Sequence, residues 1–142
     1  GRGKRAEFGA GALLVGVYDH EKDEFVSVSK IGTGLSDDEW RSIKDKTHGL
    51  ELSHKPARVN SKIEPSIWVK PEIVIEVLAD EITRSPNHTA GMVSSEDGKV
   101  VEPGYALRFP RLIKFRDKDK KPEDATTIKE LVRMYESQGR KS

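Results

Sequence analysis

GYALRFPRLIKFRDKDKKPEDATT, residues Gly104–Thr127, combines an apolar strand pattern, a dense set of cations and a helix start. Its first half, Tyr105–Phe115, has the apolar content of a β-strand. From Arg111 to Lys121 a cation then occurs at nearly every second or third position. Such a charge run is compatible with a solvated loop. However, arginines on an ordered strand present planar forks that suit bidentate contact with phosphate. We therefore predict that this segment binds phosphate groups.

An amphipathic helix is predicted after this segment, from about Thr127 to Ser137. Its first turn has the Thr-x-x-Glu spacing of a capping box, in which two side chains satisfy free backbone N–H groups. Four apolar residues follow at helical spacing, namely Ile128, Leu131, Val132 and Tyr135. This apolar stripe needs to be buried, either against the strands of the same domain or against a partner domain.

The N-terminal half begins with a predicted β-hairpin. AGALLVGVY at Ala10–Tyr18 is continuously apolar, whereas EFVSVSKI at Glu24–Ile31 alternates valines with serines. The polar residues 19–23 between them have the length of a hairpin connection. One face of this hairpin is expected to lie in the core.

A helix is predicted to follow the hairpin. Gly32-Thr33-Gly34 ends the second strand, and we interpret it as a strand-to-helix turn, with a phosphate cradle as the alternative. Ser36 and Glu39 have capping-box spacing, which predicts a helix from about Asp37 to Asp45.

The middle of the chain is predicted to contain a loop and two strands. Thr47–Lys62 is polar and without periodicity, which is typical of a loop. Ser66–Arg84 is rich in Ile and Val and is interrupted by Pro71, so we predict a short strand before this proline and one long strand after it. Trp68 is interpreted as a core residue, with a base-stacking platform as the alternative.

These elements favour a single, mainly β domain. Several short strands, one internal helix and a C-terminal amphipathic helix fit a small OB-fold Greek-key barrel. A β-sandwich is the alternative, but it does not easily explain the placement of the internal helix. We predict one domain over residues 1–142, with a basic N-terminal arm at 1–9, the barrel at 10–121, and the C-terminal helix and tail at 122–142.

Positive charge is unevenly distributed along the chain. The formal net charge is only +1, yet seven cations and two carboxylates lie in residues 104–121, and three more cations lie in residues 1–5. Basic foci on a nearly neutral protein predict contact with a polyanion on one face.

Composition argues against several other classes of protein. The chain has no cysteine, which excludes a disulfide framework and a thiolate metal site. Its four histidines lack a close set of partner ligands in the sequence, so we expect them to be solvated and predict no metal site. No apolar run approaches the roughly 18 residues of a membrane helix. The basic N-terminus also lacks an apolar signal core, so we expect no membrane contact and an intracellular location.

Four motifs occur in order along the chain. They are Lys30-Ile31-Gly32-Thr33-Gly34, Trp68-Val69-Lys70-Pro71, Ala106-Leu107-Arg108-Phe109-Pro110-Arg111 and Pro122-Glu123-Asp124-Ala125-Thr126-Thr127. In that order they resemble the C-terminal OB-fold domain of ATP-dependent DNA ligases, most closely the archaeal and eukaryotic replicative type. The leading Gly-Arg-Gly-Lys-Arg also fits, so the resemblance covers essentially the whole chain.

The resemblance implies a three-step reaction on ATP and nicked double-stranded DNA. A lysine of an adjoining nucleotidyltransferase domain attacks ATP, AMP passes to the 5′-phosphate of a nick, and the 3′-hydroxyl then displaces AMP. Mg²⁺ would be bound mainly by ATP and by that other domain. The lysine lies in a K-x-D-G motif, which does not occur here, so this chain is expected to form no AMP adduct by itself. A sliding clamp is a further partner that the resemblance allows, and the location it implies is the archaeal cytoplasm or the eukaryotic nucleus.

The resemblance also assigns roles within the basic segment. The family's last nucleotidyltransferase motif, R-x-D-K, falls at residues 116–120 and implies binding and orientation of the ATP β- and γ-phosphates. One extra residue leaves two registers open, because counting from the 106–111 motif selects Arg116 and Lys118, whereas counting back from Pro122 selects Asp119 and Lys120. The candidates for ATP phosphate binding are Arg116, Lys118, Asp119 and Lys120, of which Arg116 and Lys120 are the catalytic candidates. The candidates for DNA contact are Arg2, Lys4, Arg5, Arg108 and Arg111.

The resemblance further implies that the domain presents this motif to ATP and then rotates, placing a different face on the DNA minor groove. Two alternatives stay open. One is a stand-alone OB-type module that binds single strands without catalysis; it needs surface aromatic residues, and aromatic residues total only 6% here. The other is an interaction domain that docks on a partner through the C-terminal helix.

Overall fold

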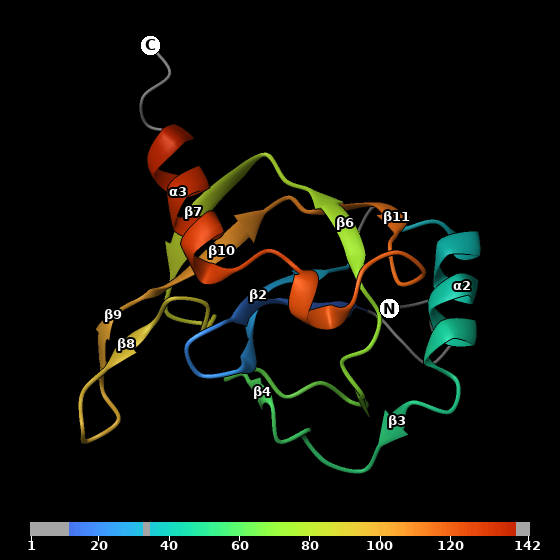
Figure 1. Ribbon diagram of the computed structural model, residues 1–142, viewed down its shortest axis with the longest axis horizontal. Helices are drawn as coiled ribbons and strands as arrows, with labels where there is room; N and C mark the ends of the chain where they lie inside the picture. Colours follow the sequence, from blue (N-terminus) through green and yellow to red (C-terminus); the bar gives the residue numbers. More distant parts are fainter. Residues whose placement is uncertain (1–11, 33–34, 139–142) are drawn as a thin grey trace.

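The computed structural model describes residues 12–32 and 35–138, and within them β-strands predominate over two α-helices (Figure 1). The predicted arm at 1–9, with Arg2, Lys4 and Arg5, lies outside the described residues, as do Thr33 and Gly34 of the predicted turn. Neither helix in the described part of the chain is long and apolar enough to cross a membrane.

The predicted hairpin is confirmed. Strand β1 (Leu13–Asp19) pairs antiparallel with β2 (Glu24–Ile31). The turn between them holds Asp23 at φ +52°, a left-handed conformation that aspartate tolerates better than most residues. Strand β2 also pairs in parallel with β4 (Val59–Asn60), so β2 is the central strand of a three-stranded sheet.

Two further antiparallel pairs meet at a corner. Strand β6 (Ile75–Leu78) pairs with β11 (Arg111–Phe115), and β7 (Glu81–Ser85) pairs with β10 (Gly104–Arg108). The prediction of one long strand after Pro71 is therefore wrong, because residues 79–80 separate β6 from β7.

The cause of this corner lies in the partner strand. Pro110 has no N–H to donate to a strand ladder, and Phe109 before it adopts φ +53°. The strand pairing is interrupted at residues 109–110, which lie opposite the break at residues 79–80 in the partner strands. The N–H of Asp80 still donates to the carbonyl of Arg108 at 2.9 Å, so the two interrupted strands bend together.

The bend divides the core into two clusters. Ile82 of β7 and Tyr105 of β10 pack with the valines of β1 and β2 in the first cluster. Leu112 of β11 packs with Trp40 in the second cluster. The fully buried tryptophan is thus Trp40, at 1% exposure, whereas Trp68, the predicted core residue, is only half-buried.

Helix α2 (Asp37–Thr47) begins at the predicted capping box. The N–H of Glu39 donates to Ser36 Oγ at 3.1 Å, and the N–H of Ser36 donates to the Glu39 carboxylate at 2.9 Å. The helix buries Trp40 and Ile43, so it covers the second cluster.

Helix α3 (Ile128–Gln138) follows the short 3₁₀ helix η1 (Pro122–Asp124), and it confirms the predicted C-terminal helix. Its capping pair is present, because the N–H of Glu130 donates to Thr127 Oγ1 at 3.2 Å. Leu131 is 1% exposed within the first cluster. The apolar stripe is therefore buried against the strands of this domain.

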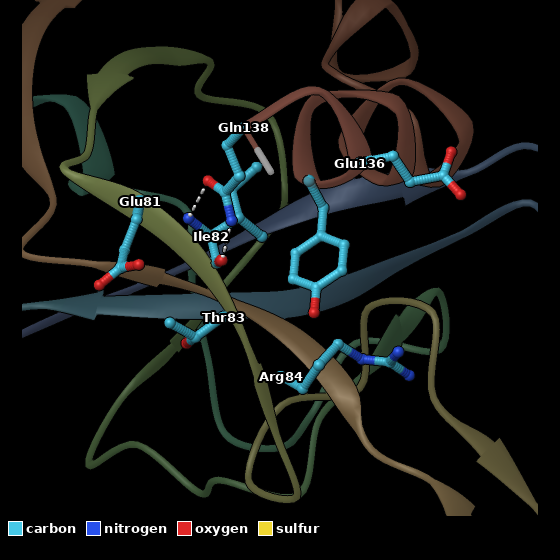
Figure 2. Close-up of a pocket in the computed structure, with 7 residues that line it drawn as sticks. Glu81, Ile82, Thr83, Arg84, Glu136 and Gln138 are labelled. Carbon is cyan, nitrogen blue, oxygen red and sulfur yellow. Dashed lines mark hydrogen bonds between the residues drawn. The ribbon is translucent and has the colours of Figure 1, made fainter. Parts of the chain in front are cut away.

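The last residue of α3 also secures the free edge of β7 (Figure 2). The side-chain amide of Gln138 accepts from the N–H of Ile82 at 3.0 Å and donates to the Ile82 carbonyl at 2.5 Å. On its other edge β7 pairs with β10. The helix thus satisfies backbone groups that an edge strand otherwise leaves open.

Four short strands complete the architecture. Strand β3 (Glu51–Leu52) pairs with β5 (Trp68–Val69), and β8 (Val93–Ser94) pairs with β9 (Val100–Glu102). The prediction of a loop at 47–62 missed β3 and β4. Among the described residues the ladders form separate sheets and do not close into one ring. The predicted mainly β class is confirmed, and the arrangement is consistent with an OB-fold.

A buried polar network joins β2 to the segment before β8. Thr89 Oγ1 accepts from the N–H of Ser27 at 3.0 Å and donates to the Asn60 carbonyl at 2.5 Å. His88 is 9% exposed, with Nδ1 3.2 Å from Ser27 Oγ. The prediction that all four histidines are solvated is therefore wrong for His88. Burial, with a further contribution from Lys30, lowers the pKa of His88 below its ordinary value of 6.5.

Acidification is expected to destabilise the domain partly through His88. The folded state keeps this imidazole neutral. Its contribution to stability is therefore fully present above the pKa that His88 has in the unfolded chain, and it is lost as the pH falls through the lower pKa that His88 has in the folded state. Urea unfolding between about pH 7 and pH 5 should show a smaller loss of unfolding free energy for His88→Gln than for the wild type. His48→Gln, at an exposed site, is the control and should behave like the wild type. Equal pH dependence in wild type and His88→Gln would contradict this assignment.

Candidate functional site

A tight turn at residues 116–120 follows β11. The carbonyl of Arg116 accepts hydrogen bonds from the N–H groups of Asp119 at 3.1 Å and Lys120 at 2.8 Å. The N–H of Arg116 donates to the carbonyl of Val74, just before β6, at 2.7 Å. The backbone therefore holds these predicted phosphate-binding residues in a defined loop rather than in a freely solvated tail.

The guanidinium of Arg116 lies between two carboxylates. Its Nε lies 3.1 and 3.0 Å from the two oxygens of Asp119, and Nη2 lies 2.7 Å from one of them. Nη1 donates to Glu76 of β6 at 3.1 Å. Hydrogen bonding from Arg116 lowers the pKa of Asp119, so this carboxylate stays ionised. The pairs fix the direction of the arginine fork before any ligand is present.

The neighbouring Asp117 contacts a different element. Its two oxygens each lie 3.2 Å from Lys46 Nζ of α2, and both side chains are largely buried. The same ammonium lies 4.8 Å from the centroid of the Phe115 ring. Helix α2 thus anchors the turn through Asp117, which leaves Asp119 as the aspartate that contacts Arg116.

The two candidate lysines of the turn, Lys118 and Lys120, are both exposed. Asp119, which lies between them in the sequence, is the aspartate that contacts Arg116. Asp119 belongs to the register that is counted back from Pro122.

A second cationic site lies at the other end of β11, at the corner. Arg108 Nη1 lies 3.0 Å from Glu81, and Arg111 Nη1 lies 3.1 Å from Asp80. Phe109 between the two arginines is 60% exposed, and the guanidinium of Arg108 lies 5.1 Å from its ring centroid. The corner thus presents two arginines and one exposed aromatic ring.

Comparison with known proteins identifies the family. The family model described as "ATP dependent DNA ligase C terminal region" matches residues 6–120. The chain belongs to this family of ATP-dependent DNA ligase C-terminal regions. A "Probable DNA ligase" from Dictyoglomus turgidum is 53% identical over 138 residues, which are 97% of this chain and 23% of that protein. A "DNA ligase" from Pyrobaculum calidifontis is 45% identical with the same coverage, and one from Sulfolobus acidocaldarius is 43% identical over 99% of this chain and 23% of its own length. The chain thus spans about a quarter of the length of these relatives.

Several features of this ligase C-terminal region are not apparent from the sequence. Glu76 and Lys46, which hold Arg116 and Asp117, lie 40 and 71 residues from their partners. Only tertiary structure brings them together. Phe109 carries a local signal, because it lies between two arginines and before a proline, and the residue before a proline avoids the right-handed helical region. That signal predicts an irregular backbone but not an exposed ring.

Proposed function

We propose that this chain is the OB-fold domain of an ATP-dependent DNA ligase. In this proposal it supplies the motif that orients the ATP phosphates during lysine adenylation, and it contacts nicked duplex DNA during sealing. The observation that carries the proposal is the position of Arg116, fixed between Asp119 and Glu76 on a hydrogen-bonded turn, within the part of the chain that matches the ligase family.

The chemistry of adenylation explains why such a group is needed. A lysine of an adjoining nucleotidyltransferase domain forms a bond to the α-phosphorus of ATP, and the bond to the pyrophosphate oxygen breaks. Negative charge then accumulates on the leaving pyrophosphate. Preorganised cations lower the barrier of such a transfer because they stabilise that charge without reorganising. We assign this role to Arg116 and Lys120, with Asp119 orienting the arginine. Mg²⁺ would neutralise phosphate charge, held mainly by ATP and the adjoining domain.

We assign DNA contact to the corner between β10 and β11. Arginine forks bind phosphate oxygens and fix the register of a protein on a duplex. An exposed apolar ring between them fits the minor groove, where apolar side chains insert between base steps. Arg108, Phe109 and Arg111 combine both features on one corner. We also propose DNA contact for Arg2, Lys4 and Arg5, which lie outside the described residues. We further propose that the enzyme acts in an archaeal cytoplasm or a eukaryotic nucleus. A sliding clamp is proposed as a partner from the family resemblance alone.

The double variant Arg108→Gln/Arg111→Gln is expected to bind nicked duplex at least about tenfold more weakly than the wild type. Each arginine that contacts a phosphate releases counterions from the DNA, and the variant loses this favourable contribution. The plot of log affinity against log salt should also become shallower by up to about 1.8, at about 0.9 per contact. Fluorescence anisotropy across a salt series measures both quantities. Arg41→Gln/Arg133→Gln, with the same charge change on α2 and α3, is the matched control and should change binding much less. Equal losses in both double variants would contradict the assignment of this corner to DNA.

One observation favours a second function. Phe109 is exposed, and a surface aromatic ring serves single-strand binding by base stacking. In that case the chain would be a stand-alone OB-type nucleic-acid module without catalysis. Anisotropy titrations with nicked duplex and with a single strand of equal length distinguish the two functions. A strong preference for the single strand would favour the module, and a preference for the nicked duplex would favour the ligase domain.

A further inference from the structure

The two arginines at the corner are already occupied in the free domain. Glu81 faces Arg108 directly across the β7–β10 ladder, and the two side chains form an ion pair at 3.0 Å. Asp80, the adjacent residue, pairs with Arg111 at 3.1 Å. All four side chains are about half exposed, at 56% and 46% for the first pair and 46% and 53% for the second.

A main-chain hydrogen bond keeps these carboxylates close to the arginines. The N–H of Asp80 donates to the carbonyl of Arg108, so the acidic and basic sides of the corner are joined by a main-chain hydrogen bond. Arg111 Nη1 also donates to the carbonyl of Phe109 at 3.2 Å. Each guanidinium is therefore oriented by groups of the domain itself.

We propose that Asp80 and Glu81 are positioning residues that occupy Arg108 and Arg111 in the free domain and are displaced by the phosphates of duplex DNA. Carboxylate and phosphate oxygens accept the same planar fork. Exposed ion pairs of this kind contribute little stability, so phosphate oxygens can replace the carboxylates at a small cost in free energy. The inference rests on the assignment of this corner to DNA.

This exchange has two consequences for binding. Duplex binding trades two internal ion pairs for two phosphate contacts, and the released carboxylates remain near the phosphates and repel them. The exchange therefore lowers the affinity of the domain for any duplex DNA. Because the arginines are neutralised internally, fewer counterions are released when the duplex binds, so the dependence on salt is also shallower than two free arginines would give.

The test is a salt series of duplex binding with the variants Asp80→Asn, Glu81→Gln and the double variant. The double variant should bind nicked duplex about three- to tenfold more tightly at low salt. Its log–log salt plot should become steeper, and this gain together with the slope lost in Arg108→Gln/Arg111→Gln should total about 1.8, at about 0.9 for each arginine. A purely structural role would not steepen the salt plot. The single variants should each show about half of the effect, which keeps the test decisive if the double variant folds poorly.

The matched control is Glu96→Gln/Glu102→Gln, which makes the same change in net charge on the β8–β9 hairpin. This hairpin lies at the other end of β10 from the corner (Figure 1). Glu102 is six residues from Arg108 along an extended chain, about 20 Å, which is beyond the screening length of about 8–10 Å. The affinity of this control variant for nicked duplex should stay close to that of the wild type.

Two results would overturn the inference, and they have different meanings. Unchanged or weaker binding by Asp80→Asn/Glu81→Gln, while Arg108→Gln/Arg111→Gln loses affinity, would refute the exchange but leave the DNA face intact. Unchanged binding by Arg108→Gln/Arg111→Gln would refute the DNA face itself and the exchange with it.

Discussion

Arg116→Ala in a full-length ligase carrying this chain is expected to slow self-adenylation by about 100-fold or more, the usual effect of removing one preorganised group that stabilises transition-state charge. Sealing of pre-adenylated nicks should be affected much less, because pyrophosphate has already left. Transfer of radiolabelled AMP to the enzyme measures the first step, and single-turnover sealing of a pre-adenylated nick measures the last. Equal losses in both steps would refute this division of labour.

The two registers of the motif can be separated by the same assays. Lys120→Ala should share the adenylation defect, because Asp119, the aspartate of the same register, is the one that contacts Arg116. Lys118→Ala is the matched control, with the same charge change two residues away. Arg116→Lys keeps the charge but loses the fork, and its defect should therefore lie between those of the wild type and Arg116→Ala. A larger defect in Lys118→Ala than in Lys120→Ala would select the other register.

Gly104→Ala is expected to lower the free energy of unfolding by about 3 kcal/mol or more, because overpacking against rigid backbone cannot be relieved by a rotamer change. A Cβ at this position would overlap the carbonyl oxygen of His88 and lie 2.8 Å from its carbonyl carbon. Both atoms belong to the buried segment that pairs with β2 and β10. Urea or thermal unfolding followed by circular dichroism measures the loss.

A second glycine provides the control for this substitution. Gly98 has φ +84°, and no atom lies within 4 Å of the point that a Cβ would occupy there. Asparagine tolerates this left-handed conformation better than most residues. Gly98→Asn should therefore cost much less stability than Gly104→Ala. A wild-type unfolding midpoint for Gly104→Ala would show that the β10 backbone can move away from His88.

Local sequence signals predicted the elements that local interactions determine. The hairpin and both helices depend on alternation, on a turn of suitable length and on capping pairs three residues apart, and all of these are present in a short window of sequence. The corner at Phe109 depends on breaks in two paired strands that lie opposite each other. The apolar run after Pro71 belongs to only one of these strands, so it did not predict the corner. The two-residue strands β3 and β4 have too few residues for periodicity, and only tertiary pairing defines them.

The candidate site likewise combines features that the sequence shows with features that only the tertiary structure creates. Arg116 follows from a motif, and the charge run around it is visible in the sequence. Its environment is not, because Glu76 comes from β6 and the anchor of the turn comes from α2. The register of the motif was open for the same reason: counting residues cannot show which aspartate contacts the arginine. The pairs at the corner, in turn, depend on the strand register that places Glu81 opposite Arg108.

The contact between Gln138 and Ile82 also matters for aggregation. An edge strand with open N–H and C=O groups is a template for strand addition between molecules. Here one primary amide at the end of α3 occupies both backbone groups of Ile82 in β7. A shortened chain that ends before Gln138 would leave the N–H and C=O groups of Ile82 open at this edge, and we expect such a chain to be more prone to strand addition between molecules.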